Sequence, residues 1–431
     1  MNALEVRYTT LRDGFTLFGV LFYLQLISFF LGLGDGSSLD LAESELEGSV
    51  LNQICGLVTL LVPLFFAIRH KVFASRQFYK SNCFLLVFLL ALALSINGSY
   101  DPMLSFKRFM ALISVVFFAG FIAYNYSLEK ITFMLGCTIG IAALIGLICA
   151  LIAPDVAFIS GGIRDGAFKG IYPEKNAGAR INAIGLLLLL PMIHQRNRWA
   201  IFCSIFPLFG ILLAQSATGL VMVVAGTASY VYFLTLIHLR LNRSMTLFLG
   251  ATFIYLLICL LLFSNYSLLL GLVGRDPSLT DRTLIWEILQ PMIDAEFVTG
   301  YGFGAFWSSQ SAMAFITRWG YIGNAHNGYV ETMLNGGIIQ LVALALMLAQ
   351  VLIKQFRAVT LDPSATVRAS ALVIVGLFIT TNAVAYVIPN YRGAEFLVFC
   401  TLALSFRHPH ESCSSAAPQR LPLRRTGHVE P

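Results

Sequence analysis

Residues 131–153 read ITFMLGCTIGIAALIGLICALIA, a stretch of apolar and small residues that contains no charged side chain. A helix needs about 20 consecutive apolar residues to cross the hydrocarbon core of a bilayer, and this segment is long enough. The buried helices of soluble proteins usually contain a shorter apolar stretch. The segment therefore predicts a transmembrane helix.

Eleven further segments have the same character, although the segment at 200–214 is separated from the next by only two residues and the last is short. They cover residues 14–33, 50–68, 82–96, 105–125, 177–193, 200–214, 217–237, 245–269, 327–353, 369–388 and 394–406. The whole chain is 58% hydrophobic and 12% charged, whereas about 25% of residues are charged in soluble proteins. These figures exclude a soluble globule and a disordered chain. We predict an all-α polytopic integral membrane protein with 10–12 transmembrane helices.

The basic residues predict the orientation of these helices. Lys and Arg are more frequent on the cytoplasmic side, and a cytoplasmic N-terminus places 18 of the 28 basic residues there. The first outer loop, 34–49, then contains five acidic residues and no basic one. We expect both termini to lie in the cytoplasm.

The expected organisation follows from the same segments. Residues 1–269 would carry the first nine spans and a periplasmic loop at 154–176, 270–326 would form a long periplasmic loop, 327–406 would carry three more spans, and 407–431 would be a disordered cytoplasmic tail.

Ten basic residues fall on the outer side, which the positive-inside tendency disfavours. They are Lys107, Arg108, Arg164, Lys169, Lys175, Arg180, Arg275, Arg282, Arg318 and Arg392. Topological tolerance of long loops would explain single members of this set. Several of them nevertheless cluster in two outer segments, which suggests a role in binding anions.

The first outer segment, 161–180, has five glycines and four basic residues and leads into a span that starts near Ala177. Asn176 is a candidate N-cap for that helix. Lys175 and Arg180 would stand beside free backbone N–H groups at the helix start, an arrangement that suits a phosphate. The alternative is a pair of snorkelling basic side chains at a helix end.

The second outer segment, about 270–326, is the longest hydrophilic stretch. Apolar residues recur at helical spacing after Thr280, which predicts an amphipathic helix on the outer membrane surface. The following Gly300–Gly304 (GYGFG) imitates a nucleotide loop, but no strand precedes it and it faces away from cytoplasmic ATP. We expect it to form a tight turn.

The second segment ends at a histidine next to a polar helical face. His326 is the one histidine outside the cytoplasmic side, and Asn327, Glu331 and Asn335 repeat at helical spacing behind it. A carboxylate inside a span is costly and usually marks function, and a histidine can accept a hydroxyl proton. A hydrogen-bonded structural histidine is the alternative.

Four motifs, in this order, resemble those of O-antigen ligases and of O-antigen or exopolysaccharide polymerases. They are Asn97–Arg108 (NGSYDPMLSFKR), Phe168–Gly178 (FKGIYPEKNAG), Thr280–Trp286 (TDRTLIW) with Gly300–Gly302, and Ala325–Glu331 (AHNGYVE) with Gly336–Ile338. Together they cover most of residues 95–340, and the last two are the most specific.

The resemblance implies a membrane glycosyltransferase of the GT-C type that uses an undecaprenyl-diphosphate-linked glycan as its donor. It also implies a multi-pass protein of the bacterial inner membrane with its active site in the periplasm. His326 would be the base toward an acceptor hydroxyl, and Glu331 would orient it or be the base itself. The expected diphosphate ligands are Arg275, Arg282, Lys175, Arg180 and Lys169, with Asn176, Asn327 and Tyr329 in support. Inverting transfer with no metal and no cofactor is expected.

The motifs do not separate a ligase, whose acceptor is lipid A–core, from a polymerase, whose acceptor is a growing polysaccharide. We favour the ligase. Apart from glycans, we expect membrane lipids as partners and no nucleic acid. A polysaccharide transporter or flippase is the alternative from another class, but the chain shows no repeated halves, and its conspicuous polar groups lie at span ends.

Overall fold

The computed structural model describes residues 3–32, 50–160, 165–264, 282–320, 322–361 and 365–405. All regular elements in these ranges are helices, and the one β feature among them is an isolated bridge between Phe158 and Phe168. Seven of the described helices are long and apolar enough to cross a membrane, and four shorter helices are also apolar. The prediction of an all-α polytopic membrane protein is confirmed.

Each of the twelve apolar segments contains a helix. The principal helices of these segments are α1 (Ala3–Tyr23), α4 (Val50–Arg69), α5 (Arg76–Leu94), α6 (Pro102–Asn125), α7 (Leu128–Ile152), α9 (Lys175–His194), α10 (Arg198–Ala214), α11 (Ala217–His238), α12 (Met245–Ser264), α16 (Gly328–Leu361), α17 (Ala365–Thr381) and α18 (Ala394–Leu404). The other helices are α2 (Leu26–Gly32), η1 (Val72–Ala74), α8 (Pro154–Ala157), η2 (Leu241–Arg243), α14 (Arg282–Ala295), η3 (Phe306–Ser308) and α15 (Gln310–Trp319).

The segments at 200–214 and 217–237 are two separate helices, as predicted. Gln215 lies in the left-handed region with a φ of 47° and ends α10. The side chain of Ser216 then accepts the backbone N–H of Gly219 and caps α11. A two-residue connection is therefore enough to reverse the chain here.

The helices in the expected spans at 369–388 and 394–406 end earlier than predicted. Helix α17 ends at Thr381, and the buried Asn382 replaces the next helical turn, because its Oδ1 accepts the N–H groups of Val387 at 3.1 Å and Ile388 at 2.8 Å. A side chain that bonds nearby backbone groups competes with the helix in this way. Helix α18 has 11 residues, fewer than the ~20 needed to cross a bilayer.

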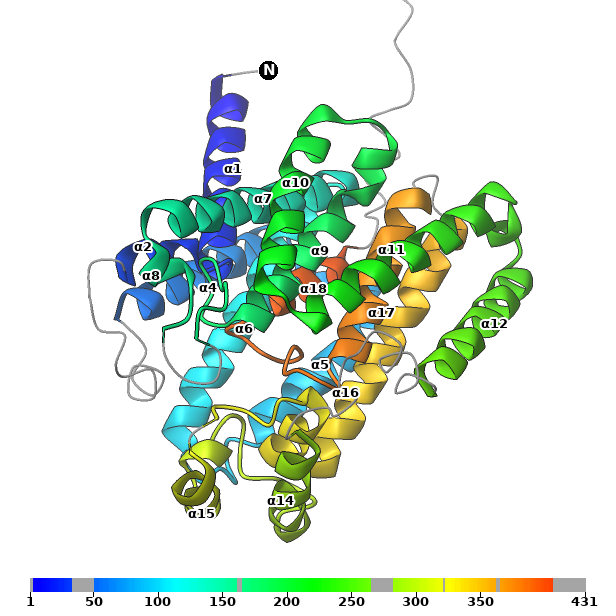
Figure 1. Ribbon diagram of the computed structural model, residues 1–431. Coiled ribbons are helices and arrows are strands. Elements are labelled where there is room, and N and C mark those ends of the chain that lie inside the picture. The colour runs from blue at the N-terminus through cyan, green and yellow to red at the C-terminus, as the bar shows by residue number, and fades with distance from the viewer. Residues whose placement is uncertain are drawn as a thin grey trace, which may run out of the picture.

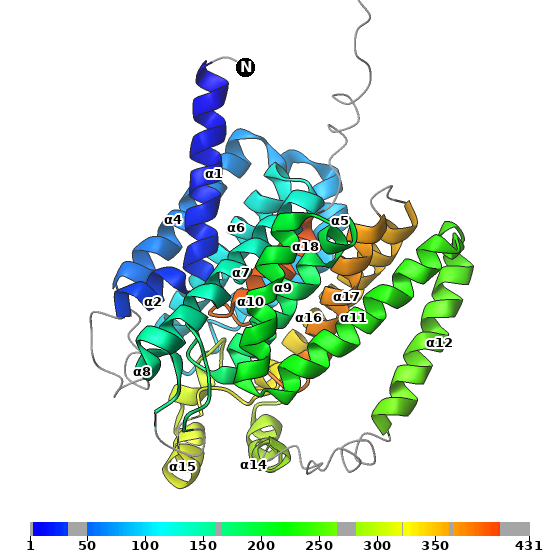
Figure 2. The same cartoon turned by 45° about the horizontal axis from the view of Figure 1, so that its top comes forward.

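The loops predicted to share the outer side gather at one end of the bundle, around α14 and α15, and the N-terminus lies at the opposite end (Figures 1 and 2). Tyr100 donates its backbone N–H to Tyr301 at 2.9 Å, and Gln25 donates its side-chain N–H to the carbonyl of Arg392 at 3.1 Å. The grouping of the loops agrees with the predicted alternation. That this end faces the periplasm stays a prediction.

Helix α16 is broken near its start by Gly336 and Gly337, and the preceding loop fills the break. Gly337 has a φ of +59°, and a Cβ there would lie 2.4 Å from the backbone of Val298. The N–H of Ile338 donates to the carbonyl of Phe297 at 2.9 Å. The N–H of Tyr301 donates to the carbonyl of Leu334 at 2.8 Å. The loop thus satisfies backbone groups that the broken helix leaves open.

Candidate active site

The described part of the long outer segment folds over the start of α16. The predicted amphipathic helix is α14, and its Leu289 and Ile293 pack with Trp307 and Phe315 in a small core of their own. The predicted tight turn also forms, because Gly300, Gly302 and Gly304 all have positive φ. This cap supports the backbone that carries His326.

Ala325, the residue before His326, is held through both of its backbone polar groups. Glu331 Oε2 accepts the N–H of Ala325 at 2.9 Å, and the indole of Trp286 donates to the Ala325 carbonyl at 3.0 Å. The next residue, His326, has a φ of 50°, which is uncommon outside glycine. Strained backbone of this kind clusters at functional sites.

Glu331 is 3% exposed, and its hydrogen bonds go to Trp307 and to the Ala325 amide. Trp307 Nε1 lies 3.2 Å from Oε1 and 3.3 Å from Oε2. Of the two roles implied for Glu331, this geometry favours orientation of His326 through the backbone.

Asn327 and Asn335, on the polar face behind His326, both bond to backbone groups. Asn327 caps α16, since its Oδ1 accepts the N–H groups of Tyr329 at 2.9 Å and Val330 at 3.2 Å. The Tyr329 hydroxyl donates to Ile379 at 2.8 Å. Asn335 Oδ1 accepts the N–H of Gly304 at 2.9 Å and so holds the glycine loop.

Among the expected diphosphate ligands, Arg282 lies in this assembly. Its Nη1 donates to the carbonyl of Val384 at 2.7 Å, so the guanidinium bridges α14 and the 382–393 loop. Arg275 lies outside the described residues, as does Arg164 of the first outer segment.

The other three expected ligands lie at the start of α9. Arg180 Nε donates to Glu395 Oε1 at 2.8 Å in a largely buried ion pair. Lys169 and Lys175 are partly exposed in the same region. Glu395 begins α18 directly after the 382–393 loop, so the ion pair ties the first outer segment to the segment that Arg282 contacts.

Asn176 is not the N-cap of α9, contrary to the expectation. The helix starts at Lys175 with Glu174 in the cap position, and Asn176 lies inside the first turn. Its Oδ1 accepts the hydroxyl of Ser216 at 2.9 Å. Asn176 therefore joins the starts of α9 and α11.

Sequence reasoning left Arg108 and Arg392 out of the proposed ligand set, although both belong to the ten outer basic residues. Arg108 Nη1 donates to the carbonyl of Gly304, and the guanidinium of Arg392 lies 5.6 Å from the ring centre of Tyr391. A local sequence pattern cannot link these two arginines, because 283 residues lie between them.

The two arginines lie within electrostatic range of the same residue, Tyr386. Burial raises the pKa of its phenol well above the usual value, and the negative charge of Glu331 adds to this effect. Arg108 and Arg392 both act on the same phenol in the opposite direction. Two guanidinium groups and the Glu331 carboxylate therefore lie within electrostatic range of Tyr386, which remains a neutral phenol.

A similar phenol lies near the α9 start. Burial, with a smaller effect from Glu395, raises the pKa of Tyr172 above its usual value. The described residues contain no group of three or more His, Cys, Asp or Glu side chains that could hold a metal ion. The described residues at this end of the bundle include a histidine, several cations, two buried phenols and the carboxylates of Glu331 and Glu395.

Residues 202–345 match the model of the family described as O-antigen ligase. This segment of the chain is therefore similar to O-antigen ligases. The match contains the His326 motif and the glycine loop, and it ends just beyond the break in α16.

The chain is also similar to a curated protein of exopolysaccharide production. The chain is 22% identical over 254 residues to the exopolysaccharide production protein ExoQ of Rhizobium meliloti (strain 1021). The aligned region covers 54% of this chain and 58% of that protein, so the chain spans little more than half the length of its relative. The apolar helices identify a multi-pass membrane protein, and residues 202–345 are similar to the O-antigen ligase family.

Proposed function

We propose that the protein is a periplasmic glycosyltransferase that moves a glycan from undecaprenyl diphosphate to an acceptor sugar. The observation that supports the proposal is the backbone of His326, which is held through Ala325 at the end of the bundle that also carries Arg108, Arg282 and Arg392. A base beside several cations suits attack on a sugar whose leaving group is a diphosphate.

In the proposed reaction, His326 accepts the proton of an acceptor hydroxyl, and the acceptor oxygen forms a bond to the anomeric carbon. The bond from that carbon to the diphosphate oxygen breaks, and lipid diphosphate leaves. One displacement of this kind inverts the anomeric centre. The arginines stabilise the negative charge that grows on the leaving group, since guanidinium groups bind phosphate oxygens in pairs of hydrogen bonds.

The other expected ligands keep a part in this proposal. Arg180 uses Nε for Glu395, and the structure records no partner for its Nη atoms among the described residues. Arg180, Lys169 and Lys175 would extend the cationic surface, and Arg275 would join it from the long outer segment. No metal ion and no cofactor enters the proposed reaction.

We propose lipid A–core as the acceptor, which makes the protein an O-antigen ligase. The family model that matches residues 202–345 is named for this activity. A polymerase that extends O-antigen or exopolysaccharide is the second candidate, because ExoQ is named as an exopolysaccharide production protein.

The reaction is tested with purified full-length protein and an undecaprenyl-diphosphate-linked glycan. Release of lipid diphosphate that depends on an added acceptor is the expected result. Release without any acceptor, or none with either acceptor, contradicts the proposal.

A deletion strain separates the two acceptors. Loss of all O-antigen from lipid A–core identifies the ligase. Accumulation of a single repeat unit on lipid A–core, or loss of a secreted polysaccharide, identifies the polymerase.

A further inference from the structure

A cavity of about 460 Å³ lies between α4, α5 and α6, near the bundle end opposite His326. Its place in the bundle follows from two contacts. The far end of α5 leads to Tyr100, beside the glycine loop, whereas Lys80 near its start contacts Gln350 in the distal half of α16. The cavity therefore has no part in the candidate active site. Its volume falls in the usual range of small-molecule sites, roughly 300–1,000 Å³.

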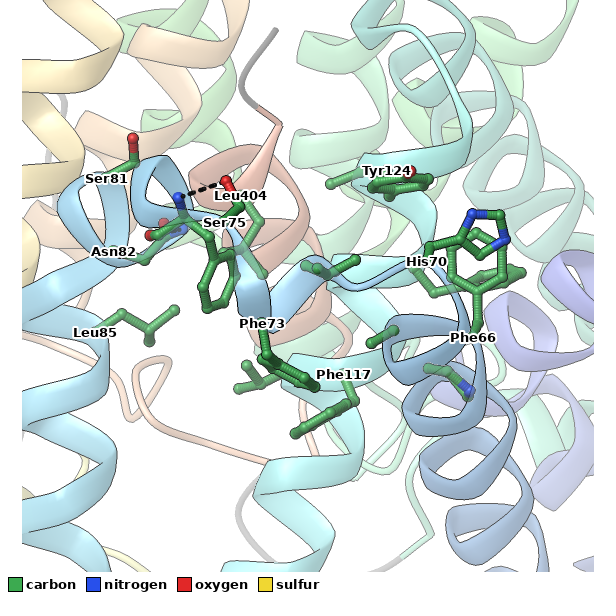
Figure 3. Close-up of a pocket in the computed structure, with 18 of the residues that line it drawn as sticks. Phe66, His70, Phe73, Ser75, Ser81, Asn82, Leu85, Phe117, Tyr124 and Leu404 are labelled. Carbon is green, nitrogen blue, oxygen red and sulfur yellow. Dashed lines mark hydrogen bonds between the residues drawn. The ribbon is translucent and has the colours of Figure 1, made fainter. Parts of the chain in front are cut away.

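The walls of this cavity are mostly aromatic and aliphatic. Figure 3 shows Phe66 and His70 on one side, Asn82 and Leu85 on the other, and Phe73 and Phe117 between them. The outer surfaces of the same helices are also apolar and exposed, as at Phe65 on α4 and Leu90 on α5. The cavity thus continues a surface that faces hydrocarbon in a membrane.

The mouth of the cavity is cationic. His70 and Lys71 line it, together with Ser75 and Gln77 at the N-terminal end of α5. Arg69, Arg76 and Lys80 lie in the same short stretch of chain. Residues 50–100 contain no Asp or Glu, and neither does α6. Backbone N–H groups at a helix start and nearby cations together favour a phosphate.

A buried cation lies behind the wall of the cavity. Lys354 of α16 donates from Nζ to Asn82 Oδ1 at 3.0 Å and to the carbonyl of Ala403 at 2.9 Å. Asn82 is itself a lining residue. The positive potential at this end of the cavity therefore comes from two directions.

We propose that this cavity binds an anionic glycerophospholipid, with an acyl chain between α4, α5 and α6 and the headgroup phosphate at Lys71 and the start of α5. Charge complementarity carries the choice of occupant, because an apolar cavity with a purely cationic mouth matches an acidic headgroup on a hydrocarbon chain. A zwitterionic lipid would bring a positive group to the same mouth.

The test uses delipidated full-length protein in detergent, titrated with palmitoyl-oleoyl phosphatidylglycerol or with the matching phosphatidylcholine. Native mass spectrometry counts the lipids that each protein retains. We expect one phosphatidylglycerol to bind with at least tenfold higher affinity than phosphatidylcholine. Equal binding of the two lipids would overturn the proposal.

Two variants and a control locate this lipid. Gly120→Leu fills the cavity from α6, where a Cβ meets only Leu404 at 3.7 Å, and should abolish the retained lipid. Lys71→Asn suits the left-handed backbone at that position, with a φ of 53°, and should weaken binding about fivefold. Arg243→Gln, in η2 and away from the cavity lining, should change nothing.

Unchanged phosphatidylglycerol retention in Lys71→Asn and in folded Gly120→Leu would show that the lipid binds elsewhere, which overturns the proposal. Displacement of phosphatidylglycerol by undecaprenyl phosphate at equal mole fraction would assign the cavity to an isoprenoid lipid and overturn it as well. Since the readout is bound lipid, glycan transfer can fail its own test without affecting this one.

Discussion

The carboxylate of Glu331 accepts the backbone N–H of Ala325 at 2.9 Å, six residues earlier in the chain. Trp307 donates to the same carboxylate, so one buried side chain fixes both the indole and the peptide that precedes His326. The acidic residue one turn into α16 is thereby tied to the position of the candidate base.

Replacement of the candidate base should stop glycan transfer. His326→Asn is the informative variant, because Asn tolerates the left-handed backbone better than Ala does and leaves the strain unchanged. We expect transfer to fall about 10²–10⁴-fold, the usual contribution of a general base. The measurement is lipid diphosphate release by purified protein, with thermal unfolding as the control for folding. Activity within a factor of three of wild type would remove His326 as the base.

Glu331→Gln should destabilise the cap over α16. The amide oxygen can take only one of the two carboxylate positions, and the NH2 group in the other position is a donor that faces the N–H of Trp307 or Ala325. A buried donor that faces another donor costs about 1–3 kcal/mol. The free energy of unfolding in detergent is the quantity to measure.

A double-mutant cycle isolates this effect. In a Trp307→Phe background the amide has a single donor to satisfy, so Glu331→Gln should cost less there than in the wild type. Equal costs in the two backgrounds would show that the carboxylate does not couple the two groups.

Arg392→Gln should weaken use of the lipid-linked donor. The exposed guanidinium lies at the outer end of the bundle near Tyr386, and loss of a charge-assisted contact with a phosphate should raise the apparent KM for donor about tenfold. Arg318→Gln on α15 is the matched control, since it removes another exposed arginine from the same end. Similar KM values in the two variants would argue against a role for Arg392 in donor binding.

Gly304→Ala should move Arg108 and lower activity. Gly304 has a φ of +72°, and a Cβ there would lie 2.5 Å from Cδ of Arg108. Gly320→Ala also has a backbone cost, at a φ of +84° and a ψ of 167°, but no atom lies within 4 Å of the new Cβ. We expect transfer to fall at least tenfold more in Gly304→Ala than in Gly320→Ala. Equal losses would attribute the effect to backbone strain alone.

The twelve apolar segments predicted where helices occur because hydrocarbon selects long uncharged stretches. They did not predict where α17 ends, since Asn382 stops that helix through hydrogen bonds with residues five and six positions later. The break in α16 at Gly336 and Gly337 depends on a loop about forty residues upstream. The composition of a segment indicates whether it lies in hydrocarbon. The positions where a helix ends or breaks depend instead on local polar contacts.

Some residues of the candidate site could be predicted from local sequence, and others are brought together only by packing. The sequence identified His326 and Glu331 from local spacing, and it placed Arg282 at the start of a helix that the structure contains. Arg108 and Arg392 come from segments far apart in the chain, and only tertiary packing brings both near Tyr386. The pairing of Arg180 with Glu395 depends on such packing too.

Two of the four tryptophans in the chain, Trp286 and Trp307, bond to groups that hold the Ala325 peptide. Indole emission depends on hydrogen bonding and local polarity, so the protein carries its own optical reporter beside the candidate base. With Trp199 and Trp319 replaced by Phe, a change in fluorescence on addition of donor would follow the backbone of His326 in real time, without any attached label.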